Sequence, residues 1–111
     1  MRRTLWPLLA FVGWTLFVWG VRIRNADGSV GAVLLSLTFI VPAVAALVRP
    51  DVVLRPLVAW TAVVWLLRVA DIVLWSDRSV GFTVVHVALG VVSVALGAAA
   101  LRGRAARPAR A

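Results

Sequence analysis

Arg68 and Asp71 are two charged residues three positions apart in the apolar run from Leu57 to Trp75. An ionised side chain at membrane depth is costly, so such residues usually pair with each other or line a path for ions or substrate. At a spacing of i and i+3, the two side chains can meet on one face of a helix and neutralise each other. Two interpretations follow, a structural ion pair and a transport or proton pathway.

His86 is the only histidine of the chain and lies in a second apolar run, from Val80 to Leu101. A neutral imidazole titrates near physiological pH and can carry a proton, although on a helix face it can also serve as a hydrogen-bonded packing residue. At about 1.5 Å per residue, one layer in the outer half of the membrane holds this histidine, the charged pair and three hydroxyl side chains. The candidate polar cluster comprises Arg68, Asp71, His86, Ser36, Thr38 and Thr15.

Four polar residues precede the second apolar run and have two interpretations. They form either a solvated loop or a cap over the candidate polar cluster from the outer side. These residues are Arg22, Arg24, Asn25 and Asp27.

The composition indicates a membrane protein and excludes several kinds of site. Hydrophobic residues make up 63% of the 111 residues and charged residues 14%, whereas a soluble domain carries about 25% charged residues. Without cysteine, the chain has no disulfide, thiolate metal site or thiol nucleophile. One histidine and one methionine are too few ligands for a metal or haem site, and no phosphate loop or Ser-His-Asp set is present. We therefore predict no catalytic residues, no metal, no cofactor and no enzymatic activity.

Four apolar runs are each close to the roughly 20 residues that cross a bilayer. They are Leu5–Val21, Val30–Val48, Leu57–Trp75 and Val80–Leu101. The first run is too long for a signal peptide and is followed by polar residues, which favours an uncleaved span. Because the connections are short, neighbouring spans should be antiparallel. The sequence predicts an all-α integral membrane protein, with an antiparallel bundle of four transmembrane helices as one domain over residues 1–101.

The arginines predict the orientation and the lipid contacts. With both termini inside, eight arginines (2, 3, 49, 55, 102, 104, 107 and 110) are cytoplasmic and three (22, 24 and 78) are outside, as the positive-inside rule requires. Residues 102–111 should form a disordered cytoplasmic tail. Because most of the +8 net charge lies at the ends of the spans, we expect anionic lipids rather than nucleic acid as partners, in the plasma (inner) membrane of a bacterial cell. The expected headgroup contacts are Arg102, Arg104, Arg107 and Arg110.

Small residues recur at helical spacing and predict the packing faces. The second span has Ala32, Ser36, Phe39, Ala43 and Ala46 on one face. The fourth span has a small or polar stripe of Thr83, His86, Gly90, Ser93 and Gly97, and the first has Ala10, Gly13, Phe17 and Gly20. Each stripe should face either the bundle interior or a partner subunit.

The two halves of the chain share a short motif. Asp-Gly-Ser-Val-Gly at residues 27–31 returns as Asp-Arg-Ser-Val-Gly at residues 77–81, each time before an even-numbered span. One interpretation is a duplicated two-helix hairpin. The other is a pair of independent helix caps, because Asp and Ser are favoured at that position.

The leading functional hypothesis is a non-enzymatic accessory, assembly or scaffold component that associates with itself or with another membrane protein. The alternative is a small transporter or an ion or proton pathway that uses the candidate polar cluster. A third interpretation is binding of a lipid or quinone headgroup by that cluster. In length and span count the chain resembles the small multidrug resistance transporters, but Leu5–Val21 lacks the acidic residue that defines their first span, so no family is assigned.

Overall fold

The computed structural model describes the backbone of residues 2–75 and 79–106, and side chains of residues 5–75 and 79–103. These residues form four helices and no strand: α1 (Arg2–Arg24), α2 (Val30–Val48), α3 (Pro50–Trp75) and α4 (Val80–Ala106). All four are long and apolar enough to cross a membrane. The prediction of an all-α chain with four helices of membrane-spanning length is confirmed.

Serine side chains begin the two even-numbered helices. The Ser29 hydroxyl accepts a hydrogen bond from the backbone N–H of Ala32 at 3.2 Å, and the Ser79 hydroxyl accepts one from Phe82 at 3.1 Å. Each bond satisfies a donor that the first helical turn leaves free. Before α2 the chain turns through Gly28, whose φ of 81° is a conformation that glycine adopts without strain. The shared motif therefore acts as a helix cap in both halves.

α3 begins seven residues earlier than the sequence predicted, because the expected connection of residues 49–56 is mostly helical. Only Arg49 separates α2 from α3. Pro50 is the first residue of α3, where its missing N–H costs nothing, and Asp51 adds a negative charge at the positive end of the helix. Leu54, only 1% exposed, anchors this added turn in the core.

α4 also exceeds its predicted length. Backbone hydrogen bonding continues to Ala106, so residues 102–106, expected in the disordered tail, are helical. Alanine and arginine both have high helix propensity, which favours this extension. The rest of the expected tail, from residue 107, lies outside the described residues.

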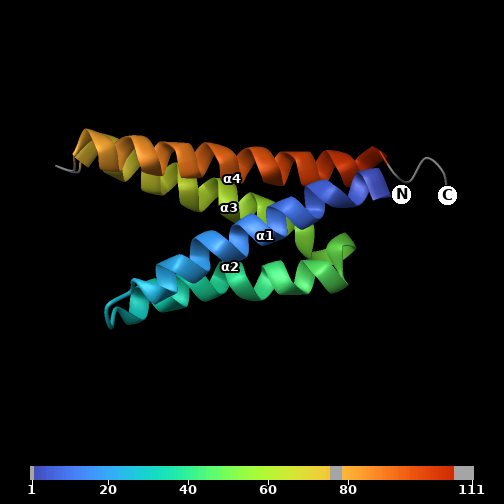
Figure 1. Cartoon of the computed structure of the whole chain (residues 1–111), viewed down its shortest axis with the longest axis horizontal. Coiled ribbons are helices and arrows are strands. Elements are labelled where there is room, and N and C mark those ends of the chain that lie inside the picture. The colour runs from blue at the N-terminus through green and yellow to red at the C-terminus, as the bar shows by residue number, and fades with distance from the viewer. Residues whose placement is uncertain (1, 76–78, 107–111) are drawn as a thin grey trace.

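The four helices contact one another in a closed ring. α1 packs against α2 and α4, and α3 packs against the same two helices. Figure 1 shows the start of α1 and the end of α4 at one end of the bundle and the α1–α2 connection at the other end. Towards that second end, the α1–α2 pair diverges from the α3–α4 pair.

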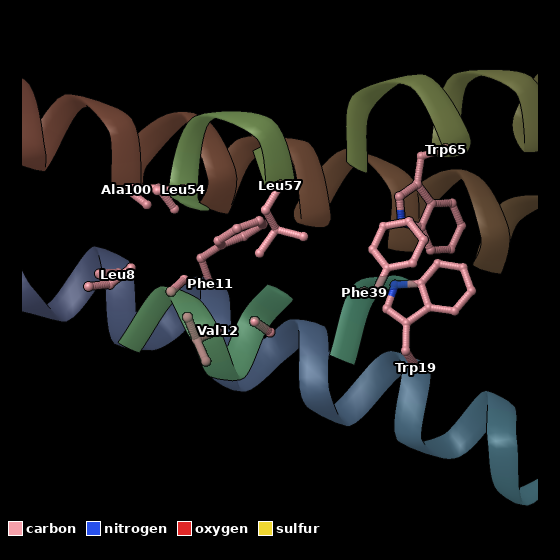
Figure 2. Packing of buried hydrophobic residues seen from close by; sticks show 11 residues of the cluster. Leu8, Phe11, Val12, Trp19, Phe39, Leu54, Leu57, Trp65 and Ala100 are labelled. Atoms are coloured by element: carbon pink, nitrogen blue, oxygen red, sulfur yellow. The ribbon is translucent and has the colours of Figure 1, made fainter. Parts of the chain in front are cut away.

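The core is apolar and has an aromatic centre. Phe11 and Phe39 are fully buried, and Trp19 stacks on Phe39 with ring centroids 4.1 Å apart. The ring centroids of Trp65 and Trp19 are 5.9 Å apart. Figure 2 shows the rings of Trp19, Phe39 and Trp65 close together. The aromatic centre therefore joins α1, α2 and α3.

The predicted packing faces are confirmed for α2 and α4 but not for α1. The buried residues of α2 are Ala32, Ser36, Phe39, Ala43 and Ala46, as predicted. On α4, a Cβ atom added to Gly97 would lie 3.1 Å from Val58 and 3.3 Å from Phe11. On α1, however, Gly13 and Gly20 have no neighbour within 4 Å and Phe17 is 62% exposed. The α1 stripe therefore faces outward.

Candidate functional site

The six residues of the candidate polar cluster do not meet at one place. Ser36 is fully buried on α2, and its hydroxyl donates to the carbonyl of Ala32 at 2.7 Å. Thr38 is exposed; it donates to the Leu35 carbonyl at 2.6 Å and accepts from the Trp60 indole at 2.9 Å. The hydroxyl groups of α2 thus bond to their own helix backbone and to α3, a common arrangement for Ser and Thr in membrane helices.

Asp71 is separated from the rest of the cluster. No ion pair within 4.0 Å joins it to Arg68, although both residues are described. Asp71 is exposed, while its neighbour Ile72 is buried at 6% exposure. Since successive residues on a helix are about 100° apart, burial of Ile72 turns Asp71 away from the core. The predicted pairing on one helix face is therefore not formed.

Arg68 and His86 do come together, in a pocket between α1, α3 and α4. The pocket has a volume of about 360 Å³. Thr15 is buried on α1 but is not part of its lining. The lining residues are Val18, Trp19, Val21, Arg22, Asn25, Trp65, Arg68, Phe82, His86 and Leu89.

The polar residues of the pocket belong to its outer part. Arg22 and Asn25 come from the end of α1, and Arg68 and His86 come from α3 and α4. None of the described lining residues is acidic. Arg22 is half-buried, and its side chain makes no hydrogen bond or ion pair with another described residue. A guanidinium group offers a planar set of donors to an anion.

The deep part of the pocket is apolar. Trp19 and Trp65 belong to the aromatic centre of the core and are 5% and 4% exposed. Leu89 adds an aliphatic surface from α4. The pocket therefore changes from cationic near the end of α1 to aromatic and aliphatic near the middle of the bundle.

His86 has one ring nitrogen engaged and one left for a ligand. Its Nδ1 lies 2.8 Å from the carbonyl oxygen of Phe82, and its ring stacks on the Phe82 ring at 4.0 Å. Because a carbonyl oxygen can only accept, this contact requires the proton on Nδ1. In the neutral ring, Nε2 then presents a lone pair that can accept a hydrogen bond from a hydroxyl group.

A second basic site lies at the other end of the bundle, between α3 and α4. Arg55 and Arg102 line a groove of about 520 Å³ together with Val58 and Leu101. Of the four arginines predicted to contact lipid headgroups, Arg102 is exposed on α4. The side chain of Arg104 and all of Arg107 and Arg110 lie outside the described residues.

The described residues contain no cluster of potential metal ligands. In residues 2–75 and 79–106, no three His, Cys, Asp or Glu side chains come together in a way that could hold a metal ion. On the surface, an ion pair joins Arg49 to Asp51 at 3.4 Å.

Sequence reasoning found part of the pocket lining. Of the four residues expected either to cap the polar cluster or to form a solvated loop, Arg22 and Asn25 line the pocket, and Arg24 and Asp27 do not. Arg22 lies four residues after Val18, which also lines the pocket, and this spacing places the two on one face of α1. Phe82 could not be assigned, because nothing in its spacing shows that it stacks on His86.

Comparison with known proteins gives no relative. The chain matches no protein-family model, no curated protein and no solved structure.

Proposed function

We propose that the chain is a non-enzymatic accessory, assembly or scaffold component of the plasma membrane, crossing it four times as an antiparallel bundle with both termini in the cytoplasm. The excess of arginine in the sequence before the first span, between the second and third spans and after the fourth span supports this orientation. The lack of a catalytic residue set in the sequence supports a role without chemistry.

The observation that carries the proposal is the uncovered face of α1. Gly13 and Gly20 have open space around them, and Phe17 is 62% exposed between them. In lipid, helices associate through close backbone approach at small residues, because no hydrophobic force drives them together. The comparable stripe of α4 packs inside the bundle, where Gly97 lies against Val58 and Phe11. The α1 face is therefore the surface that a second membrane protein or a second copy of this chain would occupy.

Site-specific crosslinking tests this role, because the chain has no cysteine of its own. Gly13→Cys, in native membranes, should form a disulfide-linked or bismaleimide-linked species larger than the monomer. Leu66→Cys is the matched control, since Leu66 is 71% exposed on α3 and outside the α1 face. The mass of the product identifies either a dimer of this chain or a different partner. Equal crosslinking at both positions, or at neither, would contradict the proposal.

The groove at the other end of the bundle supports lipids as further partners. Arg55 lies near the start of α3 and Arg102 near the end of α4, and the two line one groove. Basic side chains close to the cytoplasmic leaflet are attracted to anionic lipids by about 1 kcal/mol each. This pair would therefore hold the cytoplasmic end of the bundle at the headgroups.

The alternative function is a small transporter or an ion or proton pathway, which the pocket between α1, α3 and α4 favours because it brings Arg68 and His86 together. A pathway would have to continue past Trp19 and Trp65, which close the deep end of the pocket. In vesicles containing the purified protein, we expect no proton flux above that of empty vesicles. A flux that disappears in His86→Ala, with the variant still folded, would favour the pathway instead.

A further inference from the structure

The basic groove of Arg55 and Arg102 continues as an apolar groove along the same two helices. Ala62 lines both grooves, and the apolar one has a volume of about 570 Å³. On α3, Ala62 and Val69 follow Arg55 at intervals of seven residues, so the three share one face of the helix. The basic and apolar parts together are called the α3–α4 groove.

α4 supplies the other wall of the α3–α4 groove. Val87 and Val94 line its apolar part and Leu101 its basic part, and the three are also seven residues apart. Ala59 on α3 and Ala95 on α4 are exposed in the lining. Because an alanine side chain ends at Cβ, these positions leave the space between the two helices unfilled. The α3–α4 groove therefore opens to the surroundings of the bundle, where lipid lies in a membrane.

The basic part of the α3–α4 groove can receive an anion. Arg55 and Arg102 are both exposed, and neither side chain makes a hydrogen bond or an ion pair with another described residue. None of the described lining residues is acidic. Asp51, one turn before Arg55 on α3, forms an ion pair with Arg49. Two guanidinium groups in one groove can donate paired hydrogen bonds to the oxygens of a phosphate.

The apolar part of the α3–α4 groove matches the depth of one leaflet. The ten residues from Ala59 to Val69 cover about 15 Å of helix axis, half of a hydrocarbon core that is about 30 Å thick. The arginines lie near the start of α3 and the end of α4, and the apolar lining continues from there towards the middle of both helices. A phospholipid has its charged and apolar parts in this order. A free phosphate would leave the apolar part uncovered.

We propose that the α3–α4 groove binds one anionic phospholipid. Its phosphate lies between Arg55 and Arg102, and one acyl chain runs past Ala62 towards Val69. The two arginines favour an anionic headgroup over a zwitterionic one, and the chain fills space that the side chains of the bundle leave open. The inference rests on the proposed insertion in a membrane. It is independent of association through the α1 face, which shares no residue with the groove.

Native mass spectrometry of the protein in neutral detergent micelles tests the headgroup contact. The probes are dioleoyl phosphatidylglycerol, dioleoyl phosphatidylcholine and glycerol phosphate, which has no acyl chain, and the Kd of the first bound molecule is measured. We expect phosphatidylglycerol to bind most tightly. The double variant Arg55→Gln with Arg102→Gln should weaken it about tenfold or more, as for loss of charge-assisted hydrogen bonds. The matched control, Arg22→Gln with Arg24→Gln, removes two charges outside the groove and should change the Kd by less than about twofold, because distant charges are screened.

Two valines of nearly equal exposure test the chain contact. Val94 is 37% exposed and lines the apolar part of the groove, whereas Val92 is 38% exposed and lies outside it. The two side chains point to opposite sides of α4, because successive residues are about 100° apart. Val94→Phe should weaken phosphatidylglycerol about fivefold or more, since the larger side chain competes with the acyl chain for space. Val92→Phe should leave the Kd within about twofold.

Four results would overturn the inference. Equal weakening by the two arginine double variants would mean general attraction to a basic surface. Phosphatidylcholine binding as tightly as phosphatidylglycerol would mean that net charge is not recognised. Glycerol phosphate binding as tightly as the lipid would mean that the acyl chain adds nothing. Equal effects of Val94→Phe and Val92→Phe would place the chain outside the groove.

Flotation with lipid vesicles on a density gradient separates these results from failure of the proposed function. Protein that floats with the vesicles is inserted, and any of the four results would then overturn the lipid site alone. Protein that stays at the bottom of the gradient would contradict membrane insertion and the lipid site together.

Discussion

Asp71 lies on the exposed side of α3, four residues before the helix ends at Trp75. About 6 Å of helix separates it from that end, so its carboxylate is at a depth where a charge is still unfavourable. It forms no ion pair with Arg68. In this it differs from Asp51, which pairs with Arg49 in the first turn of the same helix.

This difference predicts opposite effects of replacing the two carboxylates by leucine. Asp71→Leu should raise the folded yield in membranes, by an amount equivalent to about 1 kcal/mol, because it replaces a poorly placed charge with an apolar side chain. Asp51→Leu should lower it by about 0.5–1 kcal/mol, because it removes a favourable charge at a helix N-terminus. Folded yield is measured by detergent extraction and size-exclusion chromatography. A loss of yield in Asp71→Leu would indicate that the carboxylate does neutralise Arg68.

Gly97 and Gly13 occupy opposite environments within long helices. An added Cβ at Gly97 would lie 3.1 Å from a methyl group of Val58 and 3.3 Å from the ring of Phe11, whereas at Gly13 it would meet nothing within 4 Å. Gly97→Ala should therefore destabilise the contact of α4 with α3 and α1 by about 1–3 kcal/mol. Gly13→Ala should stabilise α1 by about 0.5–1 kcal/mol in the monomer, because alanine favours the helix. Unfolding in mixed micelles at high detergent-to-protein ratio measures both. Equal stability of the two variants would contradict the close packing of α4.

The same helices show how far packing faces can be predicted from sequence. On α2, most of the small residues occupy one face and the large aliphatic residues occupy the others. The spacing of Ala32, Ala43 and Ala46 therefore predicted the buried face from the sequence of this helix alone. On α1, the stripe through Gly13 and Gly20 is equally regular, yet Phe11 and Trp19 are the residues that the bundle buries. Spacing defines a face but not the neighbour that covers it. Which face of α1 packs inward depends on the sizes of the side chains with which α2 and α4 contact it.

The sequence predicts a depth for each residue of the candidate polar cluster but not its direction. Arg68 and His86, which are predicted to share a layer, line one pocket. Ser36 and Thr38 are predicted in the same layer, but their hydroxyl groups donate to the backbone of α2. Depth follows from residue number along a helix. The rotation of each helix about its axis follows from side-chain packing between helices, which the sequence of one helix does not contain.

At the scale of the whole molecule, α3 and α4 are longer than the hydrocarbon core of a bilayer is thick. α3 has 26 residues and α4 has 27, or about 40 Å each at 1.5 Å per residue, against about 30 Å of hydrocarbon. The bundle can accommodate this excess by tilting or by extending into the headgroups. Arg55 and Arg102, which line the same groove near one end of these helices, favour extension at that end.

The two ends of α2 test the orientation of the whole bundle. Val30 is 70% exposed at its start and Val48 is 74% exposed at its end. With eight arginines on the side of the termini and three on the other, the positive-inside rule places Val30 outside and Val48 in the cytoplasm. In intact cells, a membrane-impermeant maleimide should therefore label Val30→Cys and spare Val48→Cys, which should react only after the cells are opened. Because the natural chain has no cysteine, any label reports the introduced residue alone. The reverse pattern would place both termini outside, and it would move the pocket that holds Arg22 and His86 to the cytoplasmic end of the bundle.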